Sequence, residues 1–417
     1  SLTHNFTGPF NYTAIFAGFL SILVPIILWY YYTYSNILKL SSNNFYNPLN
    51  INNFNNKINE YLSIFSLFFI TILLAGTNSR ASWLSASIGG TYVLFYQTTL
   101  KNQLKNLSKS YKKYLLIGGI LVIVLGAAGI YFIKPDSANG RIFIWLVSFS
   151  IIKENFLFGV GPRMFVKAYN NAQAEWFALG KGELWQKMVC GHVEFPYNEF
   201  IRIFVEFGTI GIIICLVLVY YLIKKPYNQC RSNHVVWMRG SLLAWLVFSC
   251  FSFPLKSCIL SSILVLLILL ILIQINQKWN INPIRFSLKK LLISLSIIIL
   301  ISYFGLALGP KVYKAYWLWD EAEKLYKIKA YDEANKSYKK AYKILKWNGK
   351  FLTQYGKSLY LAEDTKKSLK ILMRAKRYWS DNVLYTTIGN VYKELKMYKK
   401  AEEAYIHAAN MIPVRFY

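Results

Sequence analysis

The chain alternates long apolar runs with short polar segments. A helix that crosses the hydrocarbon core of a bilayer needs roughly 20 mostly apolar residues, and we predict one in each run that approaches this length. The third run, ASWLSASIGGTYVLFYQ, is short and rich in Ser and Gly, which suits close packing between helices in a bilayer. The predicted spans are residues 12–35, 58–76, 81–98, 114–133, 207–223, 237–254, 257–275 and 289–308.

The basic residues of the short loops predict how these spans are oriented. Lys and Arg are retained on the cytoplasmic side. The loops 101–113, 224–239 and 277–290 are strongly basic, and the predicted spans between them place all three on the same side of the membrane. The turn 77–80, the segment 134–206 and everything after residue 309 would then lie on the outer face. The C-terminal part is also basic, but long domains are translocated largely regardless of charge.

The pattern changes at Tyr313 to helical hairpins with a repeat of 33 or 34 residues. Small residues and aromatic residues recur at this period, which resembles the tetratricopeptide repeat, where small residues let paired helices approach closely. We therefore divide the chain into a transmembrane domain, 1–310, and a tetratricopeptide-like outer domain, 311–417, although a generic helical tail is an alternative. The recurring positions are Ala334, Ser368 and Ala401; Ala341, Ala375 and Ala408; and Gly356 and Gly389.

Composition supports a membrane protein over a soluble one. Hydrophobic residues make up 55% of the 417 residues, charged residues 16%, and the formal net charge is +29. Such a charge could serve nucleic acid, anionic lipid or an anionic substrate. Because the cations cluster beside apolar runs and no nucleic-acid motif is present, we predict an all-α, polytopic transmembrane bundle that binds no nucleic acid.

The Cys and His residues do not predict a metal centre. Five cysteines and four histidines are scattered without metal-ligand spacing. We expect neither a zinc site nor a disulfide framework, and no cofactor. Because the chain begins without an initiator Met and its first residues lead straight into an apolar run, we expect it to be a segment of a longer protein.

The segment 134–206, hereafter the long loop, is far too long for a simple connection, and loops of that length are usually functional. Its first part, 141–165, has helical periodicity and closes in the sequence GVG, which predicts a helix on or dipping into the membrane surface. Its last part places His192, Glu194 and other polar residues directly ahead of an apolar run.

Several residues of the long loop resemble the signature of the O-antigen ligase and polymerase superfamily. Three stretches outside the loop agree with it: TGPFN at 7–11, NSRASWL at 78–84 and FSFPL at 251–255. The signature residues are Arg141, Trp145, Gly159, Gly161, Phe165, Asn198, Glu199, Glu206, Phe207, Gly208 and Gly211.

This resemblance implies an activity and a location. Members transfer a glycan from a polyprenyl diphosphate carrier to an acceptor hydroxyl on the outer face of the bacterial inner membrane, without a metal or a nucleotide sugar. The acceptor is lipid A core in ligases, a growing glycan in polymerases, and Ser, Thr or Tyr in protein O-oligosaccharyltransferases. We expect ligation to lipid A core by a multi-pass protein with a periplasmic active site and tail.

Arginine side chains are the expected ligands of the diphosphate. The leaving group concentrates negative charge, which in the absence of magnesium needs fixed cations, best supplied by bidentate guanidinium groups. Arg80 and Arg141 are the first candidates, and Arg163 and Arg202 are further ones. The alternative for each is contact with lipid headgroups at the interface.

The catalytic base is expected just ahead of the Asn-Glu pair. Ligases of this superfamily usually carry a His there, often adjacent to the Asn; here that position is Tyr197, and His192 lies six residues before Asn198. Glu194 competes with His192, because partial burial near a membrane raises the pKa of a carboxyl group toward neutrality. Asn198 and Glu199 are expected to position the loop.

Other classes of function stay open. A transporter or flippase for polyprenyl-linked glycans would also use arginines, but such proteins often have symmetric halves with interrupted helices, whereas the charges here crowd one long loop. A membrane-anchored scaffold would need one span. The tail could bind a protein or peptide partner, which would favour a protein acceptor.

Overall fold

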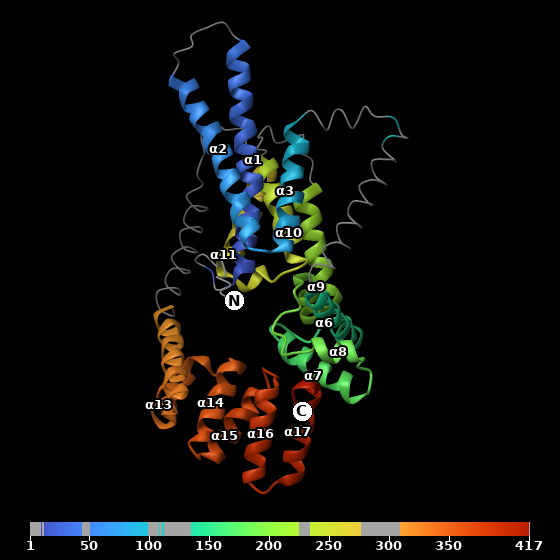
Figure 1. Ribbon diagram of the computed structural model, residues 1–417, viewed down its shortest axis with the longest axis vertical. Helices are drawn as coiled ribbons and strands as arrows, with labels where there is room; N and C mark the ends of the chain where they lie inside the picture. The colour runs from blue at the N-terminus through green and yellow to red at the C-terminus, as the bar shows by residue number, and fades with distance from the viewer. Residues whose placement is uncertain are drawn as a thin grey trace. The chain divides into compact units, whose positions relative to one another are not determined.

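The computed structural model of the chain describes residues 10, 12–43, 51–98, 108, 111, 135–224, 234–276 and 309–416. All regular structure in these ranges is helical, which confirms the predicted all-α fold (Figure 1). Of the predicted spans, 114–133 and 289–308 lie outside the described residues.

Four of the described helices are long and apolar enough to cross a membrane. They cover Thr13–Leu38, Phe54–Gly76, Glu199–Lys224 and Cys258–Ile275, which confirms the predicted spans 12–35, 58–76, 207–223 and 257–275. The predicted span 81–98 forms a less apolar helix. The predicted span 237–254 ends early, at Ser249, and leaves a shorter apolar helix, Val235–Ser249.

The chain forms two compact units. The first comprises Ser1–Ala138, Phe195–Ile203 and Ile210–Asn280, and the second comprises Asn139–Glu194, Phe204–Thr209 and Ile281–Tyr417. The predicted division into 1–310 and 311–417 stays a prediction. The described helices of the first unit are α1 (Thr13–Asn43), α2 (Ile51–Gly76), α3 (Arg80–Gln97), α10 (His234–Ser249), η2 (Pro254–Lys256), α11 (Cys258–Asn276) and most of α9 (Glu199–Lys224).

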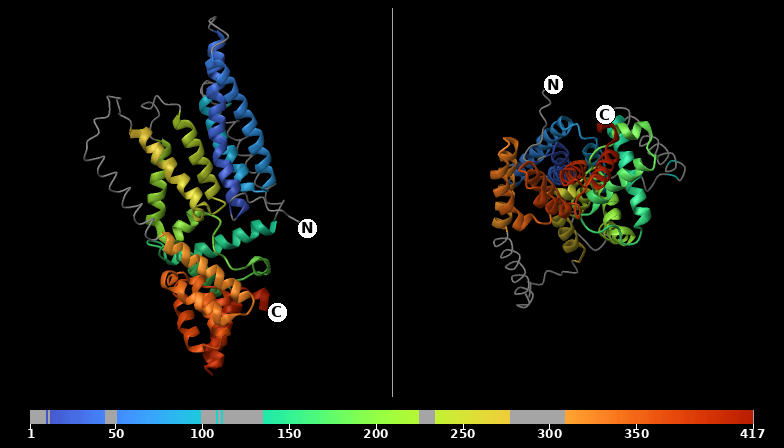
Figure 2. Two further views of the ribbon diagram at one scale, coloured as in Figure 1. Left: turned by 90° about the vertical axis from the view of Figure 1, so that its left-hand side faces the viewer. Right: turned by 90° about the horizontal axis from the view of Figure 1, so that it is seen from below.

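Small residues let α1, α3 and α10 pack closely in the first unit. A Cβ atom added to Gly89 would lie 2.7 Å from the carbonyl oxygen of Gly240, so two helix backbones touch at this point. Buried hydroxyls add hydrogen bonds: Ser21 and Ser85 lie 3.0 Å apart, and Ser85 donates to the carbonyl of Ala244. The Ser- and Gly-rich α3 is therefore packed as its sequence predicts. Figures 1 and 2 show α1 and α2 side by side along most of their lengths.

The helices α2, α9 and α11 expose large apolar side chains. In an aqueous protein such a contiguous surface would favour association, but on helices of this length it suits contact with lipid. The residues include Phe65, Phe68, Phe69 and Ile72 of α2, Ile213, Ile214 and Val217 of α9, and Val265, Leu266 and Leu269 of α11.

A kink in α9 pairs with the GVG turn of the long loop. Gly208 departs from helical geometry, with φ 64° and ψ −161°, which interrupts the hydrogen bonds of the helix. Outside partners bond to the backbone around the kink: the N–H of Val160 donates to the carbonyl of Val205 at 2.8 Å, and that of Gly161 donates to Glu206 at 3.0 Å. The kink is therefore a paired structure, because polar backbone groups that the helix does not satisfy find partners here.

Only glycine fits at two positions of this pairing. Gly159 has φ 69°, and an added Cβ would lie 2.5 Å from the carbonyl carbon of Glu206. At Gly208 an added Cβ would lie 2.3 Å from the carbonyl oxygen of Leu157. Both positive φ values and both contacts exclude a side chain.

The second unit packs the long loop on the C-terminal helices. The long loop forms α6 (Pro135–Glu154), α7 (Phe165–Ala178) and α8 (Leu184–Val189), and α7 packs against α17. Gln173 of α7 is fully buried and donates to the carbonyl of Met411 at 2.6 Å. After a helical stretch, 309–327, the C-terminal helices are α13 (Tyr331–Leu345), α14 (Gly349–Leu361), α15 (Thr365–Ala375), α16 (Asn382–Glu394), α17 (Tyr398–Met411) and η3 (Pro413–Phe416).

The recurring small residues of the C-terminal helices lie where neighbouring helices meet. Ala341, Ala375 and Ala408 are fully buried. A Cβ added to Gly356 of α14 would lie 2.5 Å from Leu372 of α15, and the Ser368 hydroxyl donates to the carbonyl of Gly356 at 2.7 Å. The helices follow one another side by side (Figure 1, orange to red), and their identity as tetratricopeptide repeats stays a prediction.

Substituting Gly159 should destabilise the protein far more than substituting Gly180. Both residues have nearly the same positive φ, 69° and 68°, but a Cβ at Gly180 meets nothing within 4 Å. Gly180→Ala should therefore cost only the conformational strain, about 1–2 kcal/mol, whereas Gly159→Ala adds a clash with backbone atoms for a total of about 2–5 kcal/mol. Thermal unfolding of the purified chain in detergent measures the difference. Equal midpoints for the two variants would show that the pairing is not rigid.

Candidate functional site

Four stretches that are far apart in the sequence meet in one aromatic cluster of the first unit. Phe253, of the stretch FSFPL, stacks on Phe195 with ring centroids 4.7 Å apart and contacts Tyr197 edge to face at 5.7 Å. Phe10, of TGPFN, and Ala81, of NSRASWL, pack in the same cluster. The stretches that resemble the O-antigen ligase superfamily are therefore neighbours in space. We call these residues the Phe253 cluster.

Glu199 ties the start of α9 to the segment after Phe253. The Glu199 side chain is buried; its Oε1 accepts the backbone N–H of Leu255 at 3.0 Å, and its Oε2 lies 3.3 Å from the guanidinium of Arg202. Asn198 accepts the N–H groups of Phe200 and Ile201 and so caps the helix. A carboxylate bound in this way fixes the loop by charge-assisted hydrogen bonds.

Three cations belong to the segments that carry the Phe253 cluster. Arg80 begins α3 and directly precedes Ala81 of the cluster, and Arg202 pairs with Glu199. The ammonium of Lys256 lies 4.0 Å from the ring centroid of Phe195. Lys256 was not a predicted site residue, although its place directly after FSFPL was a signal that could have identified it.

The other two predicted arginines lie in the second unit. Arg141 is half-buried in α6, two residues before Phe143, which is buried against Phe177 and Trp185. Arg163 is exposed in the turn before α7, with a positive φ of 62°. The aromatic residues of this part of the loop thus form its own core.

Both candidate bases contact the C-terminal helices within the second unit. The ammonium of Lys350 lies 2.8 Å from Oε1 of Glu194. The ring of His192 lies 5.3 Å from that of Trp379 by centroids. Neither partner followed from the sequence, because contacts between segments more than 150 residues apart leave no periodic signal.

Asn170 of α7 holds the residue between the two candidate bases. Its Oδ1 accepts the N–H of Val193, and its Nδ2 donates to the carbonyl of Val193, both at 3.2 Å. Asn170 is 2% exposed, so its side-chain amide is buried, and these two hydrogen bonds take the place of hydrogen bonds to water. The segment that carries His192 and Glu194 is thereby fixed to α7 of the long loop.

The surroundings of His192 favour its neutral form. Partial burial lowers the pKa of His192 below its usual range and Lys350 lowers it further, whereas the carboxylates of Asp381 and Glu194 act in the opposite direction. A neutral imidazole can accept a proton at physiological pH. The two carboxylates would stabilise the imidazolium that results.

The positions of these residues can be compared with known proteins. The sequence profile of the O-Antigen ligase family matches residues 65–216, which include α3, the long loop and the start of α9. The matched region thus holds every arginine predicted to bind the diphosphate and both candidate bases.

Three rickettsial proteins provisionally named polysaccharide ligases are similar to the chain. The protein of Rickettsia felis is 29% identical over 174 residues, covering 39% of this chain and 40% of the relative. That of Rickettsia conorii is 28% identical over 173 residues, 39% of each chain. That of Rickettsia typhi is 25% identical over 226 residues, 51% of this chain and 53% of the relative. The matches span about two fifths to one half of the relatives' lengths. This multi-pass helical protein is thus similar to the O-antigen ligase family and to part of these proteins.

Proposed function

We propose that the protein is an O-antigen ligase-like glycosyltransferase. It transfers a glycan from a polyprenyl diphosphate carrier to an acceptor hydroxyl, on the sugar core of lipid A, at the periplasmic face of the bacterial inner membrane. The observation that carries the proposal is the Phe253 cluster, where the stretches that resemble the superfamily meet beside Arg80, Arg202 and Lys256.

The cations fit the departure of the carrier. In the transfer, the acceptor oxygen bonds to the anomeric carbon, the bond from that carbon to the diphosphate oxygen breaks, and the polyprenyl diphosphate leaves as an anion. Fixed guanidinium and ammonium groups stabilise the charge that develops on it, and they need no reorganisation when they are held in advance. The contact of Arg202 with buried Glu199 holds its guanidinium in this way. Arg141 and Arg163, in the second unit, stay predicted ligands of the diphosphate.

The acceptor proton goes to His192 in the proposed reaction. Its lowered pKa leaves the imidazole neutral, and Asp381 and Glu194 favour the protonated product. Glu194 itself is held by Lys350, which supports a role in orienting His192 and stabilising its charge. Glu194 as the base is the alternative.

The transfer itself can be measured with a defined donor. The full chain in native membranes or nanodiscs, given a radiolabelled polyprenyl-diphosphate oligosaccharide, should label lipid A core. Label in a Ser/Thr peptide would point to protein O-glycosylation, and elongation of the donor glycan would point to polymerisation. Movement of intact donor across the membrane, without label in any acceptor, would support the flippase alternative instead.

Replacing Arg141 should abolish transfer without unfolding the protein. Arg141→Ala is expected to lower kcat by about 10²-fold or more, because the loss of one fixed donor to a developing anion typically has this effect. Lys153→Ala, an exposed cation at the end of the same helix, is the matched control and should retain activity. Retained activity in Arg141→Ala, with normal yield and melting, would remove Arg141 from the carrier site.

The pH dependence of kcat/KM should follow the charges around His192. Lys350→Met removes a cation that lowers the pKa of His192, so the acid limb of the profile should move to higher pH. Asp381→Asn removes an anion that raises this pKa, so the limb should move to lower pH. The opposite directions distinguish an effect on His192 from general damage to the fold.

Direct replacement assigns the base. His192→Ala should lower kcat by about 10²–10⁴-fold, the usual contribution of general base catalysis, and Glu194→Gln should lower it less. A larger loss of kcat in Glu194→Gln than in His192→Ala, together with a pH profile that Lys350→Met leaves unchanged, would assign the base to Glu194.

A further inference from the structure

The second unit contains a basic and aromatic cavity between the long loop and the C-terminal helices. Its volume is about 710 Å³, within the range of pockets that bind small ligands. Lys167 and Asn171 of α7 line one side, and residues of α13, α15, α16 and their connections line the rest. The lining residues are Lys167, Asn171, Tyr342, Trp347, Lys370, Met373, Arg374, Lys376, Arg377, Tyr378 and Tyr385.

The lining carries positive charge that the described part of the chain leaves without paired carboxylates. Five of the lining residues are Lys or Arg, and none is Asp or Glu. Among the described residues, no carboxylate lies within 4.0 Å of any of these five cations. Cations that converge on a hollow without counter-charges attract an anion from solution.

The aromatic residues of the lining include an exposed ring, Trp347, and they hold the guanidinium of Arg374 in place. The side chain of Trp347 is 61% exposed, and its ring contacts Tyr378 edge to face. Arg374 lies 5.2 Å from the centroid of Trp347 and 5.6 Å from that of Tyr342, and it donates to the Tyr342 hydroxyl and to the carbonyl of Lys346. These contacts fix the guanidinium before any ligand arrives.

A second hollow continues from the first along the C-terminal helices. It has a volume of about 320 Å³ and shares Met373, Lys376 and Tyr385 with the first. His407 lines it and lies 3.3 Å from Asn171. The two hollows together suit an elongated ligand better than a single compact anion.

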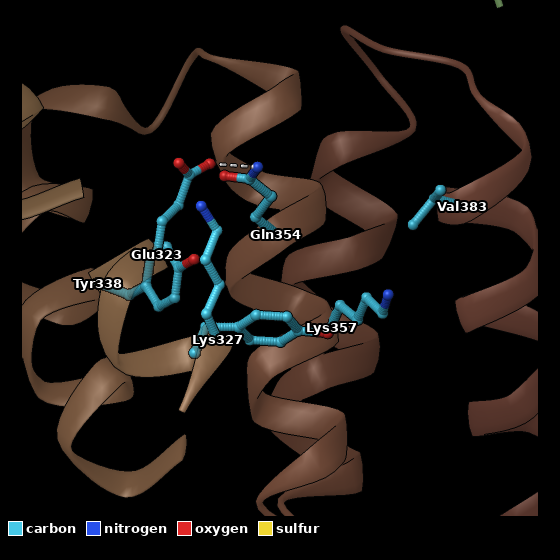
Figure 3. A pocket seen from close by; sticks show the side chains of 7 residues that line it. Glu323, Lys327, Tyr338, Gln354, Lys357 and Val383 are labelled. Atoms are coloured by element: carbon cyan, nitrogen blue, oxygen red, sulfur yellow. Dashed lines mark hydrogen bonds between the residues drawn. The ribbon is translucent and has the colours of Figure 1, made fainter. Parts of the chain in front are cut away.

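A third cavity of the C-terminal helices has a different character. It has a volume of about 280 Å³ and holds Glu323 together with Lys327 and Lys357 (Figure 3). Gln354 donates a hydrogen bond to Glu323, and Figure 3 shows the Lys357 ammonium directed away from that carboxylate. Mixed charge and an internal bond make this cavity a suitable control.

We infer that the basic cavity binds an anionic oligosaccharide that carries phosphate or carboxylate groups. Guanidinium groups match these anions in a bidentate way, and exposed ring faces pack against the C–H faces of sugars. An acidic peptide could pair with the same cations, but Met373 is the one aliphatic lining residue, so the cavity offers few apolar contacts to peptide side chains. As a site for the acceptor glycan, this inference rests on the proposed transferase.

Binding can be tested apart from transfer, with the full chain in detergent and labelled probes. The probes are a phosphorylated lipopolysaccharide core oligosaccharide, its dephosphorylated form, an oligogalacturonate and a glutamate-rich peptide, followed by fluorescence anisotropy. Lys370→Ala combined with Arg377→Ala should weaken binding of an anionic saccharide by about tenfold or more, and so should Trp347→Ala. All three side chains are exposed, so the variants should fold normally.

The control removes the same charge elsewhere in the C-terminal helices. Lys327→Ala combined with Lys357→Ala also deletes two cations, and it should leave binding unchanged. The preferred anion, phosphate or carboxylate, follows from which saccharide binds. No binding of either, tighter binding of the peptide, or an equal loss in the control would overturn the inference. If the protein transfers glycan but the cavity binds no saccharide, the inferred role of the cavity is wrong and the proposed activity stands. If the cavity binds saccharide but no transfer occurs, the proposed activity is wrong and the cavity remains a binding site.

Discussion

The backbone pairing at Gly208 is the constraint on which the rest of the site depends. A membrane-type helix that stays regular satisfies its own N–H and C=O groups and leaves none for other segments. The kink at Gly208 opens α9 to the turn 159–161, and the turn bonds to it at Val205 and Glu206. The turn 159–161 is thereby joined to the same helix that begins with the capping residue Asn198 and the buried carboxylate Glu199. Gly159 and Gly208 of the signature are thus required by geometry, because neither contact leaves room for a Cβ atom.

A second constraint acts on the segment that carries the two candidate bases. Asn170 bonds to the N–H and the carbonyl of Val193, Lys350 holds Glu194, and the ring of Trp379 lies 5.3 Å from that of His192 by centroids, tilted by 48°. Two of these partners come from the C-terminal helices, which therefore do more than extend the chain. The ion pair of Glu194 and the ring contact of His192 therefore form only when those helices are folded.

Some features of this molecule could be predicted from the sequence and others could not. Apolar runs and small-residue periodicity are local signals, and they predicted helices such as α2 and the buried positions Ala341 and Ala375. The early end of α10 at Ser249 was missed, because the apolar run continues through Phe253 while Pro254 already begins another turn. The ion pair of Glu194 with Lys350 and the basic cavity arise from packing between distant segments, which no spacing in the sequence encodes.

Tyr197 departs from the superfamily pattern in a way that fits its position in the structure. Tyr197 stands where ligases of the superfamily often carry a His, and its backbone adopts a positive φ of 54° while its ring packs edge to face on Phe253. A residue held in that conformation serves the aromatic cluster. In the proposed reaction the base therefore moves to the segment at His192, where partial burial lowers the pKa of the imidazole and the surroundings include charges from the C-terminal helices. A transferase built in this way would tie proton transfer to the same helices that form the basic cavity, so that binding of an acceptor there and activation of its hydroxyl would depend on one folded unit.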